Sequence, residues 1–243
     1  MSSFFTEIRQ TFVPAPGSRH GPLPPMLVGL TLVTGLVDAF SYLVLGHVFV
    51  ANMTGNIVFL GFALAGAPGF SFWASVVALV SFWVGALLGG RLGARLGQHR
   101  GRFLATAVSV QAAYLLAALI LSALSASPVP TAARYPLIVL LAIAMGLQNA
   151  SARKLAVPDL TTTVLTLTIT GTAADSALVG GSGSTGGRRF TSVATMFLGA
   201  LIGALLIRHG HSTLALAAAL AVLVVVAASA LRLRHADADW VRP

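Results

Sequence analysis

The chain has 243 residues, 56% of them hydrophobic and only 9% charged, against about 25% charged residues in a typical soluble domain. Its 15 basic and 6 acidic residues are too few to cover the surface of a soluble protein of this length, so a soluble protein is excluded and a lipid bilayer must cover it. The lack of cysteine excludes disulfides, thiolate metal sites and a cysteine nucleophile.

The net charge of +9 does not indicate nucleic acid as a partner. A phosphate-binding patch gathers basic and aromatic residues on one soluble face, whereas here the arginines flank apolar segments, as membrane orientation requires.

Residues 1–24 are expected to form a cytoplasmic tail. They carry four prolines and lack the uninterrupted apolar core of a cleaved signal peptide. Phe4, Phe5, Ile8 and Phe12 would share one face of a helix, so this stretch is either a short helix at the membrane interface or a disordered tail.

Six apolar stretches reach the length of about 17 to 25 residues that crosses a hydrocarbon core. Two shorter apolar pieces, 52–67 and 159–174, remain, and the topology depends on whether they cross the membrane. The predicted spans are 26–49, 70–90, 103–124, 135–152, 190–207 and 212–231.

Basic residues near span ends decide between the two topologies, because lysine and arginine concentrate on the cytoplasmic side. If all eight segments crossed, eight basic residues would lie inside and seven outside. If the short pieces enter and leave on one side, thirteen of fifteen lie inside, with only Arg134 and Arg208 outside. The sequence therefore predicts an all-α integral membrane protein with six transmembrane helices, two short re-entrant or broken segments and cytoplasmic termini.

The two halves of the chain resemble each other. GLVDA at 35–39 matches GLQNA at 146–150, NMT at 52–54 matches DLT at 159–161, and GALLG at 85–89 matches GALIG at 199–203, with offsets of 111, 107 and 114 residues. Because each copy has an odd number of spans, the second copy is inserted in the membrane with the opposite orientation. We therefore predict a 3+3 inverted repeat, with membrane repeats at 25–126 and 134–232 and a cytoplasmic tail at 233–243, and the two short pieces meeting near the midplane.

Polar residues in the first half are the first candidates for a solute site. Asp38 lies in the middle of a span, where a charge costs at least about 2.5 to 3.5 kcal/mol, so it either couples protons or binds a cation, or hydrogen-bonds a neighbouring helix. Asn52, Thr54 and Asn56 either line the outer mouth of a pathway or cap a short helix; the two roles are compatible.

The second half offers further candidates. Asp159 follows Pro158 and suits a helix N-cap or a site. Gln148 and Asn149 either face the same cavity from the other half or hydrogen-bond between helices. In a helix, one hydroxyl stripe for a solute or a partner helix would comprise Thr162, Thr166 and Thr170.

Glycines at every fourth position, Gly85, Gly89 and Gly93, form a smooth face for close helix packing, either within the chain or in a homo-oligomer. GGSGSTGGRR at 180–189 lacks the lysine of a phosphate-binding loop and is expected to be a flexible loop with cytoplasmic arginines. We expect no metal or cofactor, and no enzyme, because the motifs of zinc peptidases and serine hydrolases are missing.

Two longer motifs carry a family resemblance: GLVDAFSYLVLGHVFVANMTGN at 35–56 and AMGLQNASARKLAVPDLTTTVLT at 144–166. With these, residues 29–231 resemble the YoaK family of multipass bacterial membrane proteins, whose function is not characterised. The resemblance implies an inner-membrane location and a body of six spans, and it supplies no substrate or catalytic residue. The N-terminal tail lies outside it.

The function we expect is that of a small-solute permease or channel of the inner membrane, with a central polar site at the repeat interface and Asp38 coupling protons or a cation. The alternative is a non-transporting scaffold or accessory subunit, in which the same polar groups only hold helices together. A membrane-embedded enzyme ranks third, because the chain lacks a paired nucleophile and base.

Overall fold

The computed structural model describes residues 2–162, 165–175, 180 and 186–242, and no β-strand occurs among them. Six of its helices are long and apolar enough to cross a membrane, which confirms the predicted class and the number of spans. They are α2 (Leu23–Val44), α4 (Phe72–Leu96), α5 (Arg100–Leu124), α6 (Thr131–Leu155), α8 (Gly186–Arg208) and α9 (Ser212–Arg232).

Three short helices accompany the spans: α1 (Ser2–Phe12), α3 (Met53–Leu64) and α7 (Leu165–Ala174). At 12 and 10 residues, α3 and α7 are too short to cross a bilayer alone. α3 packs against α4, and α7 packs against α8. Both short apolar pieces of the sequence therefore contain a half-length helix.

The N-terminal stretch is helical, so the alternative of a disordered tail is wrong. α1 packs on the first turns of α8, where the Phe4 and Phe190 rings lie 5.8 Å apart and the Gly187 N–H donates to Glu7 Oε2 at 2.9 Å. This carboxylate meets the positive end of the α8 dipole. Phe5 and Phe12 stay exposed on the other side of α1.

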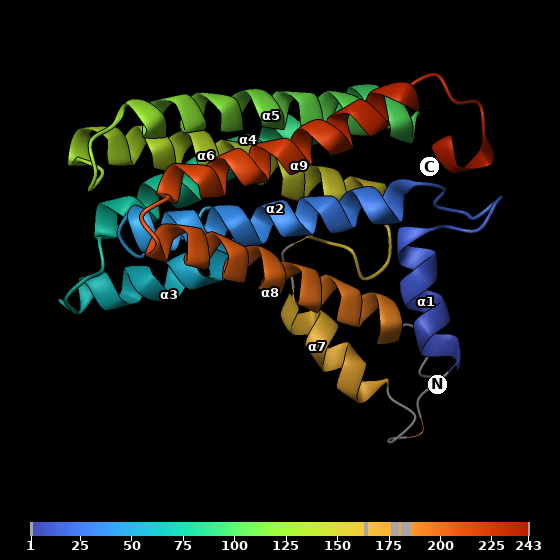
Figure 1. The fold of residues 1–243 in the computed structure, drawn as a ribbon, viewed down its shortest axis with the longest axis horizontal. Coiled ribbons are helices and arrows are strands. Elements are labelled where there is room, and N and C mark those ends of the chain that lie inside the picture. Colours follow the sequence, from blue (N-terminus) through green and yellow to red (C-terminus); the bar gives the residue numbers. More distant parts are fainter. Residues whose placement is uncertain (1, 163–164, 176–179, 181–185, 243) are drawn as a thin grey trace.

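The spans form two groups of three (Figure 1). Bundle A contains α2, α8 and α9, and bundle B contains α4, α5 and α6. Each bundle combines two helices of one half of the chain with the first span of the other half. The bundles meet mainly through α5 and α9, with a smaller contact between α2 and α6.

Glycine allows the closest contact within bundle B, the crossing of α4 and α6. A Cβ on Gly85 would lie 2.1 Å from the Ile143 carbonyl oxygen, and one on Gly146 would lie 2.0 Å from that of Phe82. Only glycine fits at such a backbone approach. Gly85 and Gly89 are therefore occupied by α6 of the same chain, and nothing at these two positions is left open for a second copy.

Bundle A has the same kind of crossing between α2 and α8. A Cβ on Gly35 would lie 2.4 Å from the Met196 carbonyl oxygen, and one on Gly199 would lie 2.4 Å from that of Leu32. The two crossings use residues from the motifs that match between the halves. The sequence similarity thus coincides with a similarity of packing.

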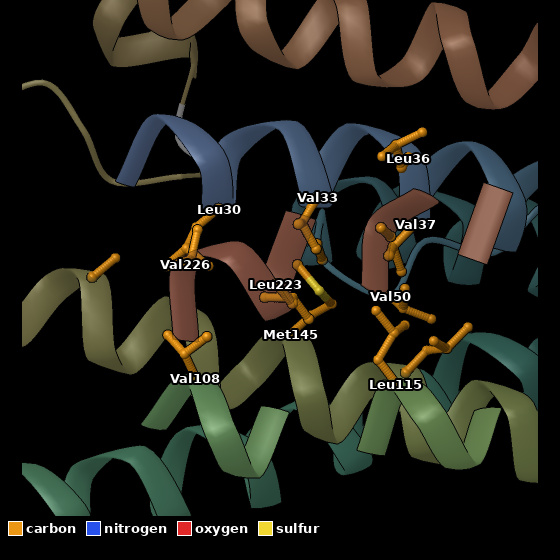
Figure 2. Packing of buried hydrophobic residues seen from close by; sticks show 14 of the residues in the cluster. Leu30, Val33, Leu36, Val37, Val50, Val108, Leu115, Met145, Leu223 and Val226 are labelled. Carbon is orange, nitrogen blue, oxygen red and sulfur yellow. The ribbon is translucent and has the colours of Figure 1, made fainter. Parts of the chain in front are cut away.

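One continuous apolar core lies between the bundles. Figure 2 shows side chains of α2, α5, α6 and α9 converging there, with Val33, Met145 and Leu223 close to one another. All three are almost fully buried. Any polar side chain in this region must find its partners inside the protein.

Both termini lie at one end of the molecule, which we call the terminal end; the other is the distal end (Figure 1). Thirteen of the fifteen lysines and arginines belong to the terminal end, where α4, α6 and α9 finish and α5 and α8 begin. Arg134 and Arg208 lie at the distal end. The structure thus separates the basic residues as the six-span prediction required.

Candidate functional site

Asp38 lies on α2 near its distal end, almost fully buried. Its Oδ1 accepts hydrogen bonds from the backbone N–H of Val50 at 3.2 Å and of Ala51 at 3.0 Å. These two residues belong to the segment that turns back into the bundle before α3. Asp38 therefore supplies the acceptor for backbone groups that lipid could not satisfy.

Asn56, fully buried on α3, hydrogen-bonds both backbone groups of Phe49. Its Oδ1 accepts from the Phe49 N–H at 2.9 Å and its Nδ2 donates to the Phe49 carbonyl at 2.6 Å. Asn52 is the N-cap of α3, with its Oδ1 3.5 Å from the Gly55 nitrogen. Asn52 and Thr54 are exposed, so the polar cluster of this motif divides into one buried anchor and two outward groups.

The segment around α3 starts and ends at the same place. A ring nitrogen of His47, before α3, lies 3.0 Å from the carbonyl oxygen of Gly69, which follows it. Both belong to the distal end, where α2 finishes and α4 begins. A set of stacked and tilted rings surrounds this closure, made of Tyr42, His47, Phe49, Phe59, Phe62 and Phe70.

The segment around α7 is closed by charges instead. Arg189, on the first turn of α8, donates from Nε to Asp159 Oδ1 at 2.9 Å and from Nη1 to Asp175 Oδ2 at 2.7 Å. Asp159 precedes α7 and Asp175 follows it, so one guanidinium joins the two ends of the segment. A Cβ on Gly171 would lie 2.8 Å from Arg189 Cζ, so the missing side chain at Gly171 leaves room for the guanidinium beside α7.

A cluster of hydrogen-bonded polar side chains lies where bundle A meets bundle B. Gln148 of α6 donates from Nε2 to Thr34 Oγ1 of α2 at 2.8 Å and to the Leu30 carbonyl at 3.2 Å. Gln111 of α5 donates to Gln148 Oε1 at 2.6 Å. All three side chains are at most 1% exposed. We call Thr34, Gln111 and Gln148 the amide cluster.

Asp38 lies one helical turn beyond Thr34 on α2. The amide cluster therefore continues along this helix toward the start of α3. Asn149, by contrast, donates to the Met145 carbonyl of its own helix at 2.9 Å. Its neighbour Gln148 is hydrogen-bonded across the bundles.

The hydroxyl stripe expected along the second short piece does not form. Thr162 precedes α7, with a φ of 66°, and Thr166 and Thr170 are exposed. Asp159 and Thr162 both adopt left-handed backbone conformations, so neither belongs to a helix, and the described helix runs over Leu165–Ala174. On α7 the buried threonine is Thr168.

Two residues of these networks were not foreseen. Gln111 is a lone amide in an apolar span, and this isolation is the only sequence feature that indicates a buried polar partner for it. Arg189 was assigned to a flexible loop at 180–189, but α8 already begins at Gly186. Its distance along the chain from Asp159 and Asp175 gave no indication of the ion pairs.

Four of the predicted site residues take part in these networks: Asp38 and Asn56 as anchors of the α3 segment, Gln148 in the amide cluster and Asp159 in the ion pair with Arg189. The remaining predicted residues lie outside them: Asn52, Thr54, Asn149, Thr162, Thr166 and Thr170. Four cavities of about 230 to 560 Å³ lie toward the two ends of the molecule. None of the four is lined by a predicted site residue. The amide cluster and the apolar residues around it are almost fully buried.

Comparisons with known proteins agree with the membrane fold. Residues 26–228 match the family described as "Protein of unknown function (DUF1275)". Over 140 residues the chain is 34% identical to a protein of Bacillus subtilis (strain 168) named "UPF0700 transmembrane protein YoaK", an alignment that covers 58% of this chain and 61% of that protein. No solved structure matches. The chain is a multipass membrane protein and belongs to the YoaK (DUF1275) family, whose match covers the spans α4, α5, α6 and α8 from end to end and most of α2 and α9.

Proposed function

We propose that the protein is a permease or channel for a small polar solute, and that the solute passes along the interface between bundles A and B. The amide cluster carries this proposal. Three polar side chains from both halves of the chain lie buried at that interface, within spans that are otherwise apolar. Polar groups inside a membrane protein are expensive, and they mark solute pathways more often than chance.

The pairing of the two halves supports the proposal. We infer that they form a 3+3 inverted repeat, because the α2–α8 and α4–α6 crossings use glycines from matching motifs. Proteins built in this way bind their solute between the repeats, next to broken or half-length helices. α3 and α7 are such helices here.

We also infer that both termini are cytoplasmic and that the membrane is the bacterial inner membrane. The thirteen basic residues of the terminal end support this orientation. α3 then enters from outside the cell and α7 from the cytoplasm.

Asp38 is the acidic group available for coupling. The hydrogen bonds recorded for its carboxylate in the described part of the chain all involve Oδ1. A proton or a cation would therefore bind at Oδ2, while Oδ1 keeps its two backbone partners.

The near-complete burial of the amide cluster favours a second candidate, a non-transporting scaffold or accessory subunit in which the cluster only joins helices. The two candidates differ in whether water ever reaches the cluster. A permease must expose it to each side in turn, and a channel to both sides, whereas a scaffold keeps it dry.

The natural absence of cysteine makes this difference measurable without knowing the solute. We would introduce Thr34→Cys and treat sealed vesicles of known orientation with a membrane-impermeant thiol reagent. Ala78→Cys, fully buried inside bundle B, is the matched control. We expect labelling of residue 34 from each side and none of residue 78. If residue 34 reacts only after denaturation, the transport proposal is wrong and the scaffold stands.

A further inference from the structure

A small cavity at the terminal end combines positive charge with buried polar atoms. It measures about 230 Å³ and lies between the segment that joins α1 to α2 and the first turn of α8. The polar residues that line it are Gln10, Ser18, Arg19, His20 and Arg188.

Three arginines lie at or near this cavity. The ion pairs recorded within the described residues involve neither Arg19, Arg188 nor the nearby Arg100. Burial first, and then these three guanidinium groups, lower the pKa of His20. Of the acids in this region, Glu7 accepts the Gly187 N–H, and Asp237 and Asp239 line an adjoining cavity that shares Ser18. An anion in the cavity would relieve this repulsion.

Two polar atoms of the lining are buried without a hydrogen bond. Ser18 Oγ and His20 Nδ1 have no partner among the described residues. Buried polar atoms in folded proteins nearly always have one, so we infer that these two side chains turn toward the cavity when a ligand occupies it and bond the ligand there.

The wall behind the cavity is held in place by the C-terminal segment. Trp240 lies directly on the backbone of Gly21, where a Cβ would be 2.4 Å from the indole ring. Arg100 donates to the Trp240 carbonyl at 3.5 Å and to that of Leu155. The segment that carries Ser18 and His20 is therefore ordered before any ligand arrives, which reduces the entropy lost on binding.

We propose that this cavity binds a phosphate group, with Arg19 and Arg188 contacting its oxygens and Ser18 and His20 completing the hydrogen bonds. Arginine pairs suit phosphate because each guanidinium donates two parallel bonds. The phosphate comes either from the headgroup of an anionic phospholipid or from a free phosphate compound. The site is outside the bundle interface and does not depend on the proposed transport.

The test measures thermal unfolding of the full chain in nanodiscs of phosphatidylcholine. In one arm, inorganic phosphate replaces chloride at constant ionic strength. In the other, one part in about five of the lipid is phosphatidylglycerol, whose surface charge alone attracts basic residues. We expect at least one of these probes to raise the unfolding temperature of the natural protein.

The double variant Arg19→Gln/Arg188→Gln should lose that rise, with the affinity reduced about a hundredfold if each arginine contributes about tenfold. The control Arg95→Gln/Arg153→Gln removes the same charge from exposed positions at the same end and should keep the rise. Ser18→Ala preserves every charge and should weaken binding several-fold.

A rise with phosphatidylglycerol alone identifies a lipid headgroup as the source, and a rise with inorganic phosphate identifies a free phosphate compound. The proposal is overturned if neither probe raises the unfolding temperature, or if both double variants lose the rise equally. The phosphate-site proposal does not depend on the thiol-labelling experiment: it stands even if Thr34→Cys is not labelled from either side.

Discussion

The two half-length helices occupy corresponding places in the two halves, yet different forces hold them. The α3 segment is held by backbone hydrogen bonds that buried Asp38 accepts, by those of buried Asn56 and by a set of packed aromatic rings. Arg189 holds the α7 segment through two ion pairs. The glycine crossings of the spans, in contrast, are alike in both halves. The framework thus follows one plan, while each short segment is closed by its own chemistry.

The largest effect is expected where the halves are alike. Gly85→Ala and Gly199→Ala each place a Cβ within 2.4 Å of a backbone oxygen, so two helices must separate. We expect either change to lower the free energy of unfolding by about 3 kcal/mol, measured by thermal unfolding in detergent. Gly90→Ala is the control, because nothing lies within 4 Å of its Cβ. A large loss in one crossing and none in the other would contradict their equivalence.

Asp38→Leu tests the hydrogen bonds of the α3 segment. It leaves the Val50 and Ala51 N–H groups without an acceptor, and we expect a loss of about 2 kcal/mol. Amide exchange at these residues should accelerate, while the α7 segment stays unchanged. Asp38→Asn keeps an oxygen acceptor and should retain most of the stability. Equal damage from both variants would show that the charge, not the acceptor, matters.

Arg189→Gln tests the ion pairs of the α7 segment. The side chains of Arg189 and Asp159 are 16% and 17% exposed, but that of Asp175 is 57% exposed, so we expect a loss of only about 1 to 2 kcal/mol. Added salt screens the ion pairs, so it should speed proteolysis of the α7 segment in the natural protein. It should not change proteolysis of the α3 segment. Arg153→Gln, at an exposed position, is the control. Equal salt sensitivity of both segments would contradict the view that ion pairs hold the α7 segment and not the α3 segment.

The smallest expected change in stability comes from adding one methyl group to a glycine of each short helix. Gly171→Ala places a Cβ 2.8 Å from Arg189 Cζ and should cost about 1 kcal/mol. Gly61→Ala on α3 meets nothing within 4 Å and should be neutral or stabilising by about 0.5 to 1 kcal/mol. Both are measured by thermal unfolding. The opposite order would mean that the guanidinium does not lie against α7.

Hydropathy and charge were enough to predict the spans and the short segments, because a bilayer imposes both signals on the sequence directly. The ends were less accurate. α4 continues to Leu96 and α5 starts at Arg100, beyond the predicted 90 and 103, since basic side chains at helix ends reach the interface without ending the helix.

The candidate site was harder, because its partners come from distant parts of the chain. The sequence predicts a buried Asp38 in mid-span, whereas in the structure it lies buried toward the distal end of α2, and nothing local indicates that the Val50 and Ala51 N–H groups are its partners. Gln148 was chosen without Gln111, which lies 37 residues away on another helix. Periodicity describes one helix at a time and does not describe contacts between helices.

The glycine crossings determine how the molecule is able to deform. Backbone contact at Gly35 and Gly199, and at Gly85 and Gly146, leaves no slack inside either bundle, so each behaves as a rigid block. Along the apolar α5–α9 surface the close glycine approach recorded is at the terminal end, where a Cβ on Gly101 would lie 2.8 Å from the Leu233 carbonyl oxygen, and we expect the rest of this surface to allow sliding. Sliding along it would strain the hydrogen bonds of Gln148 to Thr34 and to the Leu30 carbonyl, which join the two bundles through buried side chains.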